Sequence, residues 1–177
     1  MPPPIKVDLK PHDPQWAVLA ERESQALMTA LPRCLETVHH IGSTAVPGLR
    51  AKPVIDLIPA AASLDDLDAS RHHLEALGYE WWGELGLTGR RYCTKSDRLT
   101  GDRRVQLHCY ANGDAEITRH LAFRDYLIER VDVAEAYERE KLRCQALHPD
   151  DSHAYSACKD AWIKKREAEA LAIYCED

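Results

Sequence analysis

The sequence predicts an α+β fold, in which helices pack a mixed β-sheet and a helical region forms the C-terminal part. Strand-like alternation lies in the first two-thirds of the 177 residues, whereas the last third has only the helical spacing of apolar residues. The chain has no internal repeat and no Gly/Ser-rich linker. We therefore expect a single domain over 1–177, with a sheet-containing core at 1–113 and a helical region of the same domain at 114–177.

Elements of the first half are predicted from apolar periodicity and from helix-cap signals. An acid followed by a proline begins the first helix, and Ser63 and Gly78 delimit the second. Two glycines and two prolines predict a loop over 42–53, with room for one helical turn. This half is expected to contain strands at 5–9, 35–41 and 54–58, and helices at 14–31 and 64–77.

The second half begins with three short strand candidates and ends in helices. A polar turn over 96–101 joins two of these strands as a hairpin, and Asn112-Gly113 marks a further turn. The expected strands are 79–82, 91–95 and 105–110, and the expected helices are 115–129, 132–147 and 154–174. The chain should build a sheet of about five strands.

The charge composition argues against general nucleic-acid binding. Lys and Arg number 23 against 29 Asp and Glu, a net charge of −6, whereas such proteins carry a basic excess. One nucleotide in a locally basic pocket is still compatible with this composition. No apolar stretch reaches the about 20 residues that span a bilayer, and the start lacks a signal-peptide core. We expect a cytoplasmic protein without a membrane partner.

Six cysteines are scattered along the chain without a Cys-x-x-Cys pair. Isolated cysteines in a cytoplasmic protein are typically reduced. We therefore expect free thiols at Cys34, Cys93, Cys109, Cys144, Cys158 and Cys175. The sequence carries no signal for an oligomeric state.

The loop after the second expected strand, together with the strand that follows it, carries residues suited to a nucleotide. Gly42 permits close approach of the backbone to a ligand, and the exposed amides after it can hold phosphate oxygens. Ser43 and Thr44 add hydroxyl groups, and Lys52 adds a cation. Asp56 stands on the next strand and is a natural Mg²⁺ ligand. These residues predict a phosphate cradle beside a metal carboxylate.

Positions 40 to 56 have the sequence His-Ile-Gly-Ser-Thr-Ala-Val-Pro-Gly-Leu-Arg-Ala-Lys-Pro-Val-Ile-Asp, which resembles the signature of the GrpB family. The likeness extends over nearly the whole chain. It includes His12-Asp13-Pro14-Gln15-Trp16, where the family has Tyr-Asp-Pro-x-Trp, then Gln106-Leu107-His108 and Phe123-Arg124-Asp125-Tyr126-Leu127. That family is assigned to the nucleotidyltransferase superfamily. The resemblance therefore implies a fold like the catalytic domain of DNA polymerase beta.

The chain departs from the nucleotidyltransferase pattern in its carboxylates. That superfamily carries Asp-x-Asp or Asp-x-Glu and a third acid on a later strand, and close carboxylates hold two Mg²⁺ ions. Here Asp56 matches the first acid, the second place holds Ile58, and the later strand offers Gln106 and His108. The resemblance implies a Mg²⁺-dependent enzyme with a degenerate carboxylate set, and its catalytic activity stays open.

Three functions remain as alternatives. The first is transfer of a nucleoside monophosphate from a triphosphate to a small acceptor, with Asp56 ligating Mg²⁺ and His108 serving as a ligand or as the general base. The second is a non-catalytic protein that binds a nucleotide or phosphometabolite in the same cradle. The third is a metal-dependent enzyme in which His40, Asp56 and His108 bind Zn²⁺, Mn²⁺ or Fe²⁺.

Residues outside this segment are weaker candidates. Arg91 and Lys95 share a face of the expected hairpin and could clamp an anionic substrate, although a solvated hairpin face explains them as well. Lys141 and Lys159 are expected in solvent. His39 precedes the candidate ligand on a strand, so we expect it to point to the opposite face in a structural or exposed position.

Overall fold

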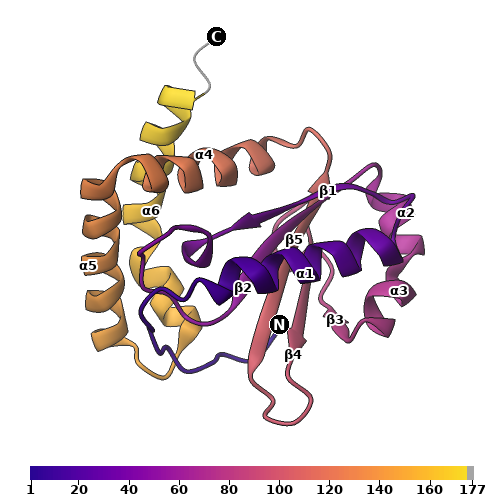
Figure 1. The fold of residues 1–177 in the computed structure, drawn as a ribbon, viewed down its shortest axis with the longest axis horizontal. Coiled ribbons are helices and arrows are strands. Elements are labelled where there is room, and N and C mark those ends of the chain that lie inside the picture. Colours follow the sequence, from indigo (N-terminus) through magenta and orange to yellow (C-terminus); the bar gives the residue numbers. More distant parts are fainter. Residues whose placement is uncertain (175–177) are drawn as a thin grey trace.

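The computed structural model describes residues 1–174 and confirms the α+β fold class (Figure 1). Its mixed five-stranded sheet has the order β1-β2-β5-β4-β3. Strands β2 and β5 are parallel, and the other neighbours are antiparallel. The strands are β1 (Leu35–Ile41), β2 (Ile55–Ala61), β3 (Tyr79–Trp81), β4 (Arg91–Ser96) and β5 (Arg103–Ala111).

One face of the sheet is covered by α1 (Gln15–Ala30), α2 (Leu64–Ala69) and α3 (Arg71–Ala76). Helix α1 begins where the sequence predicts, because Asp13 Oδ1 accepts a hydrogen bond from the amide of Gln15 at 2.9 Å. It crosses in front of the sheet in Figure 1. Its apolar side packs on Leu57 of β2 and Leu107 of β5, both fully buried.

The other face of the sheet supports the helical region, which comprises α4 (Ala115–Glu129), α5 (Val131–Leu147) and α6 (Ser152–Tyr174). These three helices lie together at one side of the molecule in Figure 1. Helix α4 packs on the sheet through Ile117, which joins Ile41, Ile58 and Tyr110 in one buried cluster. Apolar residues of α5 and α6 then pack against α4.

The strand predicted at 5–9 is wrong. Backbone pairing near this segment is limited to one bridge, between Lys10 and Ala51, and the segment otherwise lies against the corner between α5 and α6. The amide of Val7 donates to the carbonyl of Pro149 at 2.8 Å. The alternation arises because Val7 and Leu9 are buried against that corner rather than against a sheet neighbour.

The single helix predicted at 64–77 is two short helices. Ser63 caps α2 as expected, because its Oγ accepts a hydrogen bond from the amide of Asp66 at 3.4 Å. Ser70 then interrupts the run, and its hydroxyl contacts Cys34 Sγ at 3.1 Å. Serine competes with regular helical hydrogen bonding. The break lets Leu67 and Leu74 both reach the core under α1.

The prediction of free thiols is wrong for one pair. Cys144 of α5 and Cys158 of α6 form a disulfide with Cα atoms 5.8 Å apart. The pairing depends on how the two helices pack, which cysteine spacing alone does not reveal. Cys34, Cys93 and Cys109 are free and buried, and Cys175 lies outside the described residues.

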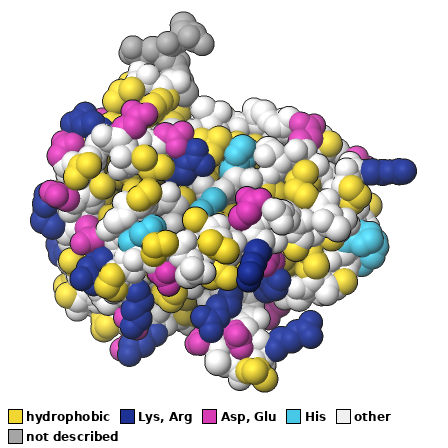
Figure 2. All heavy atoms as spheres, in the orientation of Figure 1, with side chains coloured by type: hydrophobic (Ala, Val, Ile, Leu, Met, Phe, Trp, Pro, Cys, Tyr) yellow, Lys and Arg dark blue, Asp and Glu magenta, His cyan; other side chains and the backbone are white. Residues whose placement is uncertain are grey.

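The surface carries both signs of charge. On the face shown in Figure 2, basic and acidic side chains lie interspersed, in keeping with the small acidic excess of the composition. Within residues 1–174, no helix combines the length and the apolar character needed to cross a lipid bilayer.

Candidate functional site

A cavity of about 250 Å³ lies on the sheet face that supports the helical region. Its floor is formed by Asp56 of β2 with Gln106 and His108 of β5. The turn after β1 forms one wall, and side chains from α4, α5 and α6 form the other walls. The cavity therefore collects residues from both the sheet core and the helical region.

The turn after β1 brings backbone against the carboxylate. Ile41 pairs with Asp56 across β1 and β2, so the next residue, Gly42, lies beside that side chain. Gly42 has φ +73°, and a Cβ at this position would lie 2.8 Å from Asp56 Oδ2. Only glycine fits such a backbone and such a close approach. A short 3-10 turn, Ser43–Ala45, follows, as the loop prediction allowed.

Asp56 and His108 form the polar end of the cavity floor. Because Asp56 pairs with Gln106 across the parallel strands, His108 lies one alternation further on the same face. Its Nε2 is 3.6 Å from Asp56 Oδ1. The ring of His120 from α4 lies nearby, tilted by 43° with ring centroids 5.9 Å apart. Burial, followed by repulsion from Arg119, lowers the pKa of His120 to about 2. His120 is therefore a neutral wall beside a carboxylate–imidazole pair.

Three lysines also line the cavity, and we call Lys52, Lys141 and Lys159 the lysine cluster. Two tyrosine rings lie among them. The Nζ atoms of Lys52 and Lys159 are 5.4 and 4.9 Å from the ring centroid of Tyr155, and that of Lys141 is 4.9 Å from the ring of Tyr137. Aromatic faces stabilise cations at such distances.

In the described residues, no lysine of the lysine cluster forms an ion pair with a carboxylate. In residues 1–174 the lysines that pair with carboxylates are others, namely Lys10, Lys95 and Lys164. Burial, with repulsion from Lys159, lowers the pKa of Lys52 to about 8 and that of Lys141 to about 7. A bound anion would raise these pKa values again, because an opposite charge nearby favours the charged form of an amine.

Lys141 also fixes the glycine-serine turn. Its side chain is only 1% exposed, and its Nζ donates to Ser43 Oγ at 3.2 Å and to the carbonyl oxygen of Arg50. Both ends of the loop between β1 and β2 are thus tied to one buried amine of α5. The turn that touches Asp56 through Gly42 therefore touches the lysine cluster through Ser43.

A second carboxylate lines the cavity but is engaged by an arginine. Glu167 of α6 forms an ion pair with Arg119 of α4, and its exposed fraction is 8%. Burial raises its pKa. On the same side, Arg124 Nη1 donates to the carbonyl oxygen of His40 at 3.1 Å and holds the end of β1. Asp56 is consequently the carboxylate of this cavity that no arginine engages.

The structure brings six of the predicted residues to this cavity, namely Gly42, Ser43, Thr44, Lys52, Asp56 and His108. It does not bring Arg91 and Lys95 there. Arg91 pairs with Asp68 at 2.6 Å and Lys95 pairs with Glu23 at 2.7 Å. The predicted clamp on an anionic substrate therefore does not lie in this cavity, because both cations are engaged by acids on or beside the opposite face of the sheet.

His40 is also separated from the proposed metal set. It pairs with Leu57 across the sheet, so its side chain lies on the face under α1, and its Nε2 is 2.9 Å from Thr44 Oγ1. In the described part of the chain, the His, Cys and acidic ligand atoms that gather within 4.8 Å of one another belong to another group, Glu140, Cys144 and Cys158. It is His39 that shares the Asp56 face, so the expected sides of the two histidines are exchanged.

The helical part of the cavity was not predicted from the sequence. Lys141 and Lys159 were expected in solvent, yet both line it together with Tyr137 and Tyr155. A signal for Lys141 exists in the sequence. The buried residues of α5 are Val133, Tyr137, Lys141 and Cys144, so the lysine occupies a position of the apolar stripe at helical spacing.

Comparisons with known proteins agree on one family. The model described as GrpB protein matches residues 6–169. UPF0157 protein YqkA of Bacillus subtilis is 36% identical over 169 residues, which are 95% of this chain and 48% of that protein, so the chain spans about half of its length.

Solved structures give two further matches. Conserved protein GrpB from Enterococcus faecalis has a TM-score of 0.88 at 40% identity, covering 96% of this chain and 100% of the other. The Cid1 poly(U) polymerase bound to MgATP has a TM-score of 0.47 at 14% identity over 76% of this chain and 45% of the polymerase. By the family model and these relatives, the chain belongs to the GrpB family.

Proposed function

We propose that this cavity binds a magnesium nucleoside triphosphate and that the protein transfers its nucleoside monophosphate to a small acceptor. One observation carries the proposal. The same cavity holds a carboxylate–imidazole pair and the lysine cluster, and the turn at Gly42 and Ser43 touches both. A polyphosphate with a metal ion at one end has the matching distribution of charge.

The lysine cluster would hold the phosphates. Charge-assisted hydrogen bonds from amines to phosphate oxygens are stronger than neutral ones, and they strengthen further where water is excluded. Lys52 and Lys159 would supply such bonds, while Lys141 would hold Ser43 in place for its hydroxyl and amide to do the same. The ring of Tyr155 lies beside two of these amines and limits water around them.

Asp56 fits one Mg²⁺ ion. Mg²⁺ is bound in proteins by one or two carboxylates together with substrate phosphates and water. Asp56 offers such a carboxylate, whereas Glu167 is engaged by Arg119 and the place of a second strand acid is filled by the fully buried Ile58. When bound, the ion would neutralise phosphate charge and orient the triphosphate.

His108 would act as the base for transfer. Its Nε2 lies at the cavity floor, 3.6 Å from Asp56 Oδ1, where it would accept a proton from a bound acceptor hydroxyl. The acceptor hydroxyl gives its proton to His108 as its oxygen bonds to the α-phosphorus. The bond from that phosphorus to the bridging oxygen breaks, and pyrophosphate leaves with the bonding electrons.

The second candidate function is nucleotide binding without turnover, and the buried Ile58 favours it. This side chain packs with Ile41 and Tyr110, so β2 cannot present a second acid without disrupting that cluster. Loss of the two-ion arrangement removes the clamp on the attacking and leaving oxygens. Binding needs less, because the phosphates supply most of the metal ligands.

A binding experiment tests the proposal. We expect ATP with Mg²⁺ to bind in isothermal titration calorimetry, and Asp56→Asn to weaken this binding at least about tenfold while the unfolding free energy changes little. Asp102→Asn, the same change at an exposed acid of the β4–β5 turn, is the matched control and should bind like the parent. A parent protein that binds no triphosphate would overturn the proposal.

A second experiment tests the role of the lysine cluster in ATP binding. Lys159→Gln should weaken ATP binding both with and without Mg²⁺, whereas Lys164→Gln on the same helix, at an exposed position paired with Asp160, should not. Pyrophosphate release over a panel of small hydroxyl acceptors then separates the two candidate functions. Release that disappears in His108→Gln supports transfer, and tight binding with no release over the panel supports the non-catalytic alternative.

A further inference from the structure

The disulfide lies directly behind the lysine cluster. Cys144 follows Lys141 by one turn of α5, and Cys158 immediately precedes Lys159 on α6. Cys144 belongs to a small buried cluster with Tyr155 and Leu9, and the partly buried Cys158 packs against it. Tyr155 and Leu9 also line the cavity. The covalent bond therefore joins the two helices at the point where they present their amines.

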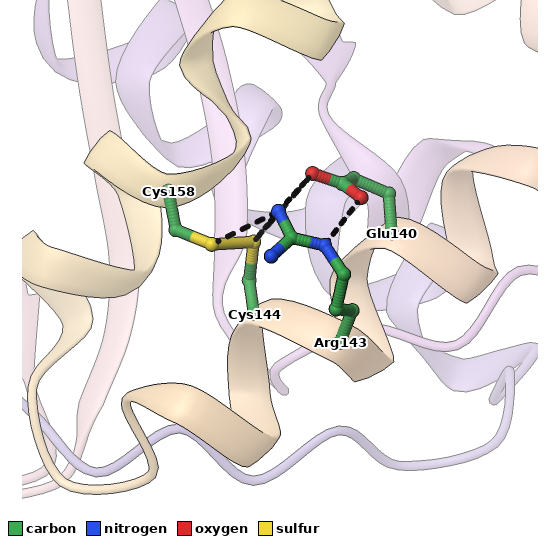
Figure 3. The surroundings of a disulfide bond; sticks show 4 residues. All are labelled: Glu140, Arg143, Cys144 and Cys158. Carbon is green, nitrogen blue, oxygen red and sulfur yellow. Dashed lines mark hydrogen bonds and ion pairs between the residues drawn. A yellow bond between two sulfur atoms is a disulfide. The ribbon is translucent and has the colours of Figure 1, made fainter.

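The two sulfur atoms differ in access and share an arginine. Cys144 is fully buried, whereas Cys158 is partly exposed. Arg143 Nη2 contacts Cys144 Sγ at 3.5 Å and Cys158 Sγ at 3.4 Å, and the same guanidinium pairs with Glu140 at 2.7 Å (Figure 3). A cation beside a cysteine stabilises its thiolate, which is the form that reacts in thiol–disulfide exchange.

The same arginine argues against a metal at this place. Ligand atoms of Glu140, Cys144 and Cys158 come within 4.8 Å of one another. The Arg143 guanidinium donates hydrogen bonds to the carboxylate and to both sulfurs. These ligand atoms are therefore already engaged by a positive charge where a metal ion would have to bind. Exchange chemistry at the sulfurs is the function that this arrangement suits.

We propose that Cys144 and Cys158 are a redox-active pair whose disulfide holds the lysine cluster in its phosphate-binding arrangement. The coupling to phosphate rests on the proposed function. The reductant is a dithiol. One of its thiolates attacks the more exposed Cys158 Sγ, and Cys144 leaves as a thiolate beside Arg143. The second thiol of the reductant then attacks its own sulfur in the mixed disulfide and releases Cys158. Two electrons and two protons pass to the protein, and the dithiol becomes a cyclic disulfide.

Electrostatic repulsion couples this bond to the cavity. Lys159 of α6 faces Lys141 of α5 and Lys52, and it lowers the pKa of both. Without a bound anion, the charged amines favour separation of the two helices at this end. The disulfide opposes that separation and keeps the amines together before the ligand arrives, which reduces the ordering cost of binding.

Reduction should change this end locally and leave the fold intact. The corner between α5 and α6 is also held by the N-terminal segment: the amide of Ser152 donates to the carbonyl of Ile5 at 3.1 Å, and Gln145 Nε2 donates to the carbonyl of Val7 at 3.1 Å. These bonds do not depend on the sulfur atoms. We therefore expect the corner between α5 and α6 to stay folded in the reduced protein, while the part of α6 near Lys159 becomes more mobile.

The experiment compares the oxidised and reduced forms of one protein. Alkylation followed by mass spectrometry, after equilibration in dithiothreitol buffers of graded composition, should show Cys144 and Cys158 becoming reactive together. Calorimetric titration with ATP and Mg²⁺ should then show binding about three- to tenfold weaker in the reduced form, because the amines are no longer pre-organised. The double substitution Cys144→Ala with Cys158→Ala should bind like the reduced parent in both buffers.

A matched control uses an unrelated buried thiol. Cys34→Ala should keep the full redox response, because Cys34 lies under α1. Equal ATP affinity in the two forms of the parent would overturn the coupling and leave the proposed function intact. Failure to bind ATP in either form would overturn the proposed function and the coupling with it. Reduced Cys144 and Cys158 under every oxidising buffer would overturn the redox pair itself, whatever the nucleotide does.

Discussion

The two faces of the sheet are built by the same strands and differ in what they enclose. Under α1, Leu57 and Leu107 are paired neighbours in a closed apolar core. On the opposite face, Asp56 and His108 are the residues next to them in sequence and form the floor of the cavity. Side chains of β2 and β5 alternate between the two faces of the sheet. Packing on the closed face therefore holds rigid the same strands that carry the polar side chains on the other face.

The helical face is itself divided. Ile58 and Tyr110 close its far end against α4, while the end beside the β1 turn stays open and charged. A substitution on the α1 face should therefore change the free energy of unfolding, and one at the open end should change ligand binding. The following substitutions test that separation, from the largest expected effect to the smallest.

Leu57→Ala should have the largest effect. The side chain is fully buried against α1, so truncation should lower the free energy of unfolding by about 2–5 kcal/mol through lost burial and a residual cavity. Urea denaturation followed by circular dichroism measures this, and ATP affinity of the folded fraction should stay at the parent value. A loss below about 1 kcal/mol would contradict a closed core on this face.

Gly42→Ala should affect both properties, because Gly42 joins the strand to the cavity. The added Cβ would meet Asp56 Oδ2 at 2.8 Å in a backbone conformation with φ +73°, and we expect a loss of about 1–3 kcal/mol of unfolding free energy together with weaker Mg²⁺–ATP binding. Gly48→Ala is the control, since Gly48 also has a positive φ but nothing lies within 4 Å of its added Cβ. It should cost stability alone. Equal losses of Mg²⁺–ATP affinity in the two variants would show that the close approach of residue 42 to Asp56 does not matter for binding.

Lys141→Met should reduce a pH dependence. Burial lowers the pKa of Lys141 from 10.5 to about 7 in the folded protein. Between these values the unfolded chain binds more protons, so stability should rise as the pH increases from about 7, while ATP binding should fall as the amines lose charge. Thermal unfolding from pH 6.5 to 9 should show a smaller rise in Lys141→Met than in the parent. Lys164→Met, at an exposed position, should keep the parental slope.

Substitution of Arg91 and Lys95 should have the smallest effect. Their ion pairs with Asp68 and Glu23 lie outside the cavity and are partly exposed, so each substitution to Gln should cost no more than about 1 kcal/mol. ATP affinity, measured by calorimetry, should not change. A clear loss of ATP binding in either variant would show that the substituted cation contributes to the substrate site.

The fold was predictable wherever a segment's own pattern decides its structure. The strand ending at Ile41, the cap at Ser63 and helix α4 over Ala115–Glu129 all follow from local periodicity and capping residues. The segment around Val7 misled the prediction because burial against a helix corner produces the same alternation as burial in a sheet. The local sequence pattern shows that a side chain is buried, but it does not show which element the side chain packs against.

The candidate site was predictable where its residues lie close together in sequence. Gly42, Ser43, Lys52 and Asp56 belong to one loop and the strand after it. Lys159 comes from α6, and its place in the cavity depends on how that helix packs on α5, which no local signal encodes. The pairing of Cys144 with Cys158 was missed for the same reason.

The cavity walls extend from Leu9 near the start of the chain to Glu167 near its end, and the N-terminal segment is held by residues at the α5–α6 corner. Contacts between segments so far apart in sequence form slowly, because each must close a long loop of unfolded chain. During synthesis, the sheet core can collapse before α6 has emerged, but the cavity cannot exist until α6 docks. Ligand binding by this protein would therefore report that α6 has docked.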